Sequence, residues 1–168
     1  KSMQDQLGLQ KIVRAMPNLP AQIGKGVTSY TASKEVSRIE LLTIENLLDT
    51  TGKSILVSSE KFIDASTGIS GSGPAYVFYF MQSMMEAALK MGFSGNDSKM
   101  LVSHTFEGAV ELFNQSDLSP NSWMERVASK GGTTRAALDS MEDNNVKELI
   151  KEAAYSAFNR AVELGQDK

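Results

Sequence analysis

The stretch "VASKGGTTRAAL", residues 127–138, brings together the residue types best suited to binding a small anion. Two glycines and two threonines stand where one helix-like pattern stops and the next begins. Glycine permits positive φ and lets a ligand approach the backbone closely. The free amides at the start of the following helix attract negative charge. A carboxylate or phosphate in this turn would therefore accept several charge-assisted hydrogen bonds.

A plain helix–turn–helix connection with a threonine cap is the alternative interpretation of this stretch. The pattern alone favours that alternative, because turns built from Gly and Thr are common. No Glu or Gln stands at the third helical position after Thr133 or Thr134 to form a capping box. The second threonine hydroxyl therefore has no obvious local task, which keeps the anion-binding interpretation open.

Two other stretches gather small or rigid residues. "GISGSGPAYVF", residues 68–78, lacks the closing glycine of a nucleophile elbow and the third glycine of a dinucleotide fingerprint. We interpret it as close backbone packing beside a long helix. "VRAMPNLPAQIGKG", residues 13–26, ends a strand with two prolines around Asn18. Strand ends bind ligands in α/β sheets, and a rigid proline turn is an equally good interpretation.

Composition narrows the possible chemistry. The chain has no cysteine and one histidine, His104, so neither a metal cluster nor a Ser-His-Asp triad is expected. The net charge is −3 and no stretch concentrates Lys or Arg, which argues against nucleic acid or an anionic membrane as a main partner. No apolar run is long enough to span a bilayer. The lack of cysteine fits a cytoplasmic location.

The hydrophobic pattern divides the chain into two parts. Residues 12–57 are predicted to be mixed α/β, with short strands within "KIVRAM", "GVTSYTA" and "SILVS" and one helix before the last strand. We expect Ser33 to cap that helix and Gly52 to end it. About three strands and one helix are marginal as an independent sheet domain, so this part is interpreted as a fragment of an α/β domain.

From about residue 65 the pattern is helical to the end of the sequence. The expected helices run from Pro74 to Gly92, after a cap at Asp97, from Ser119–Pro120, across "TRAALDSME", and from about Val146 to Leu164. Proline fits a first helical turn, and glycine fits the residue after the last turn.

The helix after Pro74 is apolar almost all round, and its methionines Met81, Met84 and Met85 continue that pattern. A helix without a polar face must be surrounded by other apolar surface. We therefore expect an intimate homodimer in which a second copy of the chain covers this helix. A central helix buried within one chain is the alternative.

Taken together, three stretches resemble the pyrroline-5-carboxylate reductases: "VRAMPNLPAQIGKGVT", "DASTGISGSGPAYVF" and "ASKGGTTRAALDSME", in this order and at about the family's spacing. The resemblance covers nearly the whole chain. It implies an N-terminal Rossmann domain followed by an all-helical dimerisation domain. The expected fold class is mainly α: residues 1–58 would be the C-terminal remnant of the Rossmann domain, and residues 59–168 the helical dimerisation and substrate-binding domain.

The resemblance also implies an activity. The family reduces the C=N bond of 1-pyrroline-5-carboxylate to L-proline with NADPH or NADH, the last step of proline biosynthesis. The family's Gly-rich phosphate-binding turn has no counterpart in this sequence. We therefore expect the sequence to be part of a longer enzyme, inactive as a fragment, and assembled as a homodimer or a larger homo-oligomer.

The resemblance assigns the Gly-Thr turn to the substrate. Backbone amides around Gly131, Gly132 and Thr133, with the Ser129 hydroxyl, would hold the substrate carboxylate. The hydroxyl of Thr134 would lie against the ring nitrogen and act as the catalytic contact.

Met16, Pro17 and Asn18 would lie beside the nicotinamide and its ribose in the same comparison. Lys130 stands where many members of the family have proline, and we expect it to face solvent. Two rival interpretations stay open: another Rossmann-plus-helical dehydrogenase that acts on a hydroxy acid, and a helical dimerisation module without chemistry. The hydroxy-acid enzyme would normally place a lysine on the helical domain, and no buried lysine is expected here.

Overall fold

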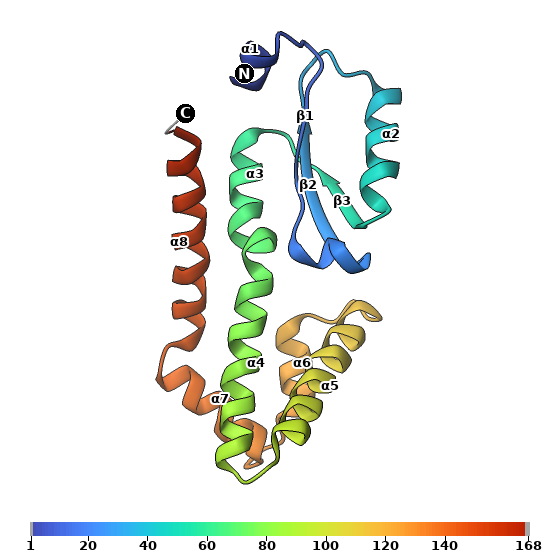
Figure 1. The fold of residues 1–168 in the computed structure, drawn as a ribbon. Helices are drawn as coiled ribbons and strands as arrows, with labels where there is room; N and C mark the ends of the chain where they lie inside the picture. The colour runs from blue at the N-terminus through green and yellow to red at the C-terminus, as the bar shows by residue number, and fades with distance from the viewer. Residues whose placement is uncertain (1, 167–168) are drawn as a thin grey trace. The chain divides into compact units, whose positions relative to one another are not determined.

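The computed structural model describes residues 2–166 (Figure 1). Its elements are α1 (Ser2–Leu7), β1 (Val13–Met16), η1 (Leu19–Ile23), β2 (Gly26–Ala32), α2 (Arg38–Asp49), β3 (Gly52–Leu56), α3 (Glu60–Ser66), η2 (Thr67–Gly71), α4 (Gly73–Lys90), α5 (Gly95–Asn114), α6 (Pro120–Val127), α7 (Thr133–Asp143) and α8 (Val146–Gln166). The element η1 is a 3₁₀ turn and η2 is a π turn. The predicted fold class, a small α/β part followed by helices, is confirmed.

The chain forms two compact units. Residues up to 76 together with those from 152 onward make the first, and residues 77–151 make the second. Both boundaries fall inside helices, α4 and α8. The predicted domain boundary between residues 58 and 59 therefore stays a prediction.

The first unit is built on a three-stranded sheet in the order β1-β2-β3. β1 runs antiparallel to β2, and β2 runs parallel to β3 with α2 as the crossover between them. Figure 1 shows α2 and α3 on either side of this sheet. The central strand is consequently the best buried: Tyr30 is 1% exposed, and Ile63 of α3 is fully buried.

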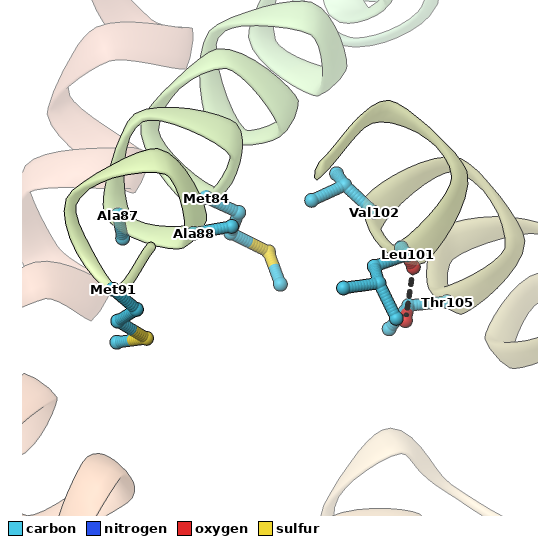
Figure 2. A pocket seen from close by; sticks show the side chains of 7 residues that line it. All are labelled: Met84, Ala87, Ala88, Met91, Leu101, Val102 and Thr105. Atoms are coloured by element: carbon cyan, nitrogen blue, oxygen red, sulfur yellow. Dashed lines mark hydrogen bonds between the residues drawn. The ribbon is translucent and has the colours of Figure 1, made fainter. Parts of the chain in front are cut away.

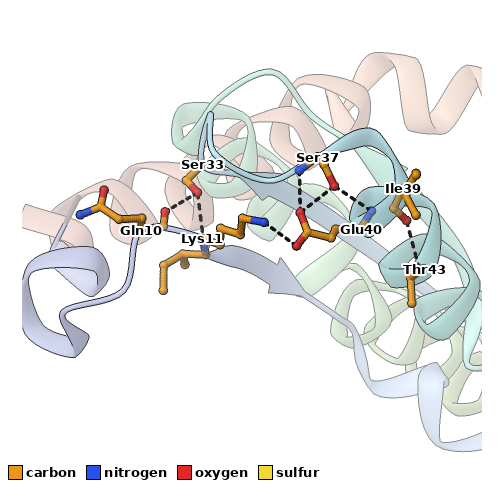
Figure 3. Close-up of polar contacts among 8 residues, drawn as sticks. Gln10, Lys11, Ser33, Ser37, Ile39, Glu40 and Thr43 are labelled. Atoms are coloured by element: carbon orange, nitrogen blue, oxygen red, sulfur yellow. Dashed lines mark hydrogen bonds and ion pairs between the residues drawn. The ribbon is translucent and has the colours of Figure 1, made fainter.

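The cap of α2 differs from the prediction. Ser37, not Ser33, caps the helix: its hydroxyl accepts from the Glu40 amide, and the Glu40 carboxylate accepts from the Ser37 amide. The Ser33 hydroxyl instead donates to the Gln10 carbonyl at 2.7 Å and accepts from the Ile12 amide at 3.1 Å, as Figure 3 shows. Ser33 thus fastens the chain before β1 to the end of β2.

Two other local predictions also need correction, and one helix was not predicted. Ser94 caps α5, and Asp97 is the acceptor for its hydroxyl rather than the cap itself. Thr50 ends α2, whereas Gly52 begins β3 with φ at +147°. The short helix α3 was not predicted, because seven residues are too few to display a helical period.

A continuous helical path from α3 to α4 is interrupted by the π turn η2. The amide of Ser72 donates to the Thr67 carbonyl at 2.8 Å, a bond that spans five residues. A Cβ at Gly68 would lie 2.9 Å from the Ala154 carbonyl oxygen and 3.0 Å from the Phe158 amide nitrogen. Close backbone packing was predicted for residues 68–78, and the structure shows it at Gly68, against α8.

The second unit contains most of α4, all of α5, α6 and α7, and the start of α8. Val102, 3% exposed, is buried here. An open apolar depression of about 250 Å³ lies between α4 and α5. Figure 2 shows Met84 of α4 and Leu101 of α5 on either side of it.

The apolar surface of α4 is exposed rather than internal. Val77, Phe78 and Tyr79 are 44%, 59% and 73% exposed, and none of the residues that the structure describes in α4 is buried. The alternative in which this helix is the buried centre of one chain is therefore wrong. No helix between residues 2 and 166 combines the length and the apolar character needed to cross a membrane.

We predict that Gly68→Ala destabilises the protein by about 1–3 kcal/mol, because the new methyl group overlaps backbone atoms of α8 that cannot move separately. Urea unfolding measures the change. Gly165→Ala is the matched control: a Cβ there meets nothing within 4 Å, and its effect should stay within about 1 kcal/mol. Equal effects of both substitutions would contradict the close contact.

We also predict that Lys11→Met raises the pKa of Glu40. Hydrogen bonds from the Lys11 ammonium and from Ser37 lower the pKa of this carboxyl from its ordinary value of 4.5 to about 2. The stabilisation from these bonds is complete above the ordinary value and is lost as the pH falls toward about 2. An NMR titration of the Glu40 carboxyl in both proteins checks this, and an unchanged pKa in the variant would refute the assignment.

Candidate active site

All the residues predicted to bind the substrate lie in the turn before α7 or at the first two positions of that helix. The chain leaves α6 at Val127, and Gly131 then adopts φ of +71°. This is the left-handed region, which a residue with a Cβ occupies at a cost of about 1 kcal/mol or more. Gly132 follows in extended conformation as the cap residue of α7, and its carbonyl accepts from the Ala136 amide at 3.2 Å. The sequence thus builds a helix start with no capping side chain.

Several donors at this helix start are unengaged. Within residues 2–166, no hydrogen bond is made by the amides of Gly131, Thr133, Thr134 or Arg135. The Gly132 amide differs, because it donates to the Ser129 carbonyl at 3.0 Å and closes the turn. Free amides and the positive end of the helix dipole together make a site for an anion.

Hydroxyl groups line the same turn. A Cβ at Gly132 would lie 2.5 Å from the Ser129 Oγ, so the absence of a side chain at 132 makes room for that hydroxyl. In the part of the chain that the structure describes, the Ser129, Thr133 and Thr134 hydroxyls have no hydrogen-bond partner. They remain available to a ligand that offers acceptors.

Of the two cationic side chains beside the turn, Arg135 is paired and Lys130 is not, within residues 2–166. Arg135 already pairs with Asp139 at 2.8 Å and with Glu142 at 3.4 Å. Lys130 is exposed, and it forms no ion pair with any residue from 2 to 166. Its exposure agrees with the expectation that it faces solvent, where its charge adds to the positive potential of the helix start.

The second group of predicted site residues lies at the end of β1, in the first compact unit. Pro17 is exposed, whereas Met16 and Asn18 are half-buried. Asn18 is engaged at both ends of its carboxamide: Nδ2 donates to the Ser70 carbonyl at 3.0 Å, and Oδ1 accepts from the Val27 amide at 2.9 Å. The residues predicted to bind the substrate and those predicted to bind the cofactor thus belong to different units.

Sequence reasoning missed the partners of Asn18. Ser70 lies in the π turn η2, 52 residues away from Asn18 along the chain. The Tyr76 hydroxyl donates to the Gly68 carbonyl at 3.0 Å and holds the same turn. The signal was present in "STGISGSGP", whose small residues permit such packing, but nothing local indicates which strand end it meets.

Two other side chains, His104 and Arg126, contact neighbours on their own helices. His104 is largely exposed on α5 and pairs with Glu107 at 3.2 Å. Arg126 lies over the Trp123 ring, 5.2 Å from its centre, a cation–π contact. Among residues 2–166, no three His, Asp or Glu side chains are grouped so as to hold a metal ion.

Comparison with known proteins identifies the family. Residues 60–164 match the family described as pyrroline-5-carboxylate reductase dimerisation. Pyrroline-5-carboxylate reductase 2 of Bacillus subtilis (strain 168) is 35% identical over 153 residues, which cover 91% of this chain and 55% of that protein. The chain belongs to the pyrroline-5-carboxylate reductase family. The resemblance found in the three sequence stretches is thereby confirmed.

Other members of the family agree in sequence and fold. The pyrroline-5-carboxylate reductase of Pseudomonas aeruginosa is 36% identical over 92% of this chain and 57% of its own length. A pyrroline-5-carboxylate reductase (proC) from Coxiella burnetii superposes with a TM-score of 0.91 at 36% identity, over 96% of this chain and 60% of that one. Plasmodium falciparum pyrroline carboxylate reductase, solved with NADP bound, gives 0.87 at 34% identity, over 92% and 59%. The chain spans little more than half the length of these pyrroline-5-carboxylate reductases.

Proposed function

We propose that the protein containing this chain reduces 1-pyrroline-5-carboxylate to L-proline with NADPH or NADH. The curated relatives carry the name of this activity, and one solved relative holds NADP. The observation that carries the proposal is the start of α7, where free amides and hydroxyls surround a glycine turn. A small ring with one carboxylate and one imine nitrogen matches these donors.

The substrate carboxylate would be held by the amides of Gly131 and Thr133 and by the Ser129 hydroxyl. Gly132 contributes space rather than a donor, because its own amide closes the turn. Charge-assisted bonds of this kind are the strong ones, and they fix the orientation of the ring as well as its position.

The Thr134 hydroxyl would contact the ring nitrogen. When the C=N bond is reduced, the ring carbon gains a hydride, and the electron pair of the π bond moves to the nitrogen, which carries the proton of the iminium form. NAD(P)H supplies the hydride when it is bound. A hydroxyl can accept from the protonated nitrogen both before and after the reaction, so Thr134 keeps the ring in register throughout.

Met16 and Pro17 form the proposed surface against which the nicotinamide ring lies. Pro17 is exposed at the strand end, and the half-buried thioether of Met16 offers an apolar contact to a flat ring. The carboxamide of Asn18 is already bonded to its own chain at both ends. We therefore propose that Asn18 lies next to the cofactor without donating to it or accepting from it.

We also propose a homodimer formed through α4. The family match is to a dimerisation region, and the helix exposes a row of large apolar side chains. Burial of apolar surface is the main favourable term in association. Assembly beyond the dimer and a cytoplasmic location belong to the same proposal.

The decisive experiment is a substrate panel with the full-length protein. Pyrroline-5-carboxylate and a set of 2-oxo acids are each tested with NADPH and NADH, and a set of hydroxy acids with NADP+ and NAD+. All reactions are followed at 340 nm, roughly the absorbance maximum of the reduced nicotinamide. Turnover of the imine alone supports the proposal. Turnover of a hydroxy acid alone, or of nothing, would refute it.

We predict that Thr134→Ala lowers kcat by about 10- to 1,000-fold, because a positioning hydrogen bond at the reacting atom is lost. Steady-state kinetics on the full-length enzyme measures the change. Thr43→Ala, on the outer side of α2, is the matched control and should keep normal turnover. Normal turnover by the Thr134 variant would remove this residue from the site.

We predict that Phe78→Glu converts the dimer to a monomer. Phe78 is 59% exposed on α4, and a carboxylate there would be desolvated in an apolar interface. Sedimentation velocity reports the state of assembly. Asn46→Asp adds the same charge on α2 and should leave the dimer intact, so a dimeric Phe78 variant would exclude α4 as the interface.

A further inference from the structure

The π turn η2 presents one carbonyl that its own helix cannot use. In a regular helix the Ser70 carbonyl would accept from the amide of residue 74, but residue 74 is a proline and has no N–H. The amide of the next residue, Ala75, does not reach Ser70 either, because it donates to the Ser72 carbonyl at 3.0 Å. The Ser70 carbonyl is therefore left for a partner outside the helix, and Asn18 is that partner.

Asn18 joins this carbonyl to the sheet. Its Nδ2 donates to Ser70 at 3.0 Å while its Oδ1 accepts from the Val27 amide, the second residue of β2, at 2.9 Å. One half-buried side chain thus bridges the end of β1, the start of β2 and the π turn. Loss of the carboxamide would leave a donor and an acceptor without their partners, which costs more than the bonds themselves contribute.

The π turn is itself firmly placed. Gly68 lies against the backbone of α8, and the Tyr76 hydroxyl bonds the Gly68 carbonyl at 3.0 Å. A Cβ at Gly71 would lie 3.4 Å from Cε of Met16, so the end of the Met16 side chain lies near the turn. The strand end that carries Met16 and Pro17 is consequently held by a fixed support through two neighbouring side chains.

We propose that Asn18 is a positioning residue, which sets the nicotinamide edge by tying Met16 and Pro17 to the Ser70 carbonyl, and that it does not bind the cofactor through its carboxamide. This proposal rests on the function proposed above. Hydride transfer is steeply sensitive to geometry, and a displacement of about 1 Å can lower the rate by about 100-fold. Loss of Asn18 should therefore slow the transfer step and leave cofactor affinity nearly unchanged.

The first test measures the single-turnover rate of hydride transfer and the Kd of NADPH in the full-length enzyme. Asn18→Ala removes both hydrogen bonds. Asn18→Asp keeps an acceptor for Val27 but sets a carboxylate oxygen against the Ser70 carbonyl. We expect both variants to transfer hydride about 10- to 100-fold more slowly, with a Kd within threefold of the parent. A single-turnover rate constant does not depend on the fraction of folded enzyme, so a merely structural role would leave it unchanged.

A raised Kd with an unchanged transfer rate would make Asn18 a direct cofactor ligand and overturn the proposal. Unchanged values for both quantities would overturn it as well. Asn46→Ala is the matched control, an exposed asparagine on α2 that should alter neither quantity.

The second test needs no activity, so it separates this proposal from the proposed function. Hydrogen–deuterium exchange compares the parent, Asn18→Ala and Asn46→Ala in peptides that span residues 67–73. We expect at least a tenfold faster exchange there in the Asn18 variant alone. Unchanged exchange would overturn the support by the π turn, even if the parent enzyme reduces pyrroline-5-carboxylate. Inactivity of the parent with faster exchange would reject the proposed function and the hydride-transfer role that rests on it, while the support of the strand end by the π turn would stand.

Discussion

The missing side chain at Gly68 is the constraint on which the first unit depends. Backbone atoms of α8 occupy the space that a Cβ would take, at 2.9 Å for the Ala154 oxygen and 3.0 Å for the Phe158 nitrogen. Because both are main-chain atoms inside a helix, they cannot yield by changing a rotamer. The approach of α8 thus fixes the π turn, and the π turn fixes the direction of the Ser70 carbonyl. The end of β1 takes its place from that carbonyl through Asn18.

The parts of the fold that follow local patterns were predictable from the sequence. The runs "KIVRAM" and "GVTSYTA" contain the strands β1 and β2, and Ser119 with Pro120 opens α6. The caps of α2 and α5 were misplaced because each region offers two polar residues that can cap. At α2 a local signal for Ser37 was overlooked, the spacing of Ser37 and Glu40 that forms a capping box. The competing Ser33 is engaged instead with Gln10, 23 residues away. Local propensity contains no information about such a partner.

The candidate site also has one part that follows from the local sequence and one part that depends on distant residues. The start of α7 is a local structure: two glycines, the free amides of a helix terminus and short hydroxyl side chains lie within six residues. The pattern therefore suggested an anion site, although by itself it favoured a plain capped turn, and only the resemblance assigned the substrate to it. The engagement of the Gly132 amide was not visible in the pattern, because it depends on how the turn closes. At the other group, "MPN" fitted a ligand-binding strand end and a rigid proline turn equally well. The role of Asn18 depends on Ser70, which only the folded chain brings near.

Pro74 lies in the chain between the proposed cofactor edge and the proposed dimer face. It lies in the first turn of α4, where a missing N–H is tolerated, and it thereby allows a helix to begin directly after the π turn. The same missing N–H frees the Ser70 carbonyl for Asn18. The helix that starts here carries Val77, Phe78 and Tyr79, whose exposed surface needs a cover. A residue with an amide at position 74 would offer Ser70 a partner within the helix and compete with Asn18. The proline in "SGSGPAYVF" therefore supports both the end of β1 and the start of the apolar helix.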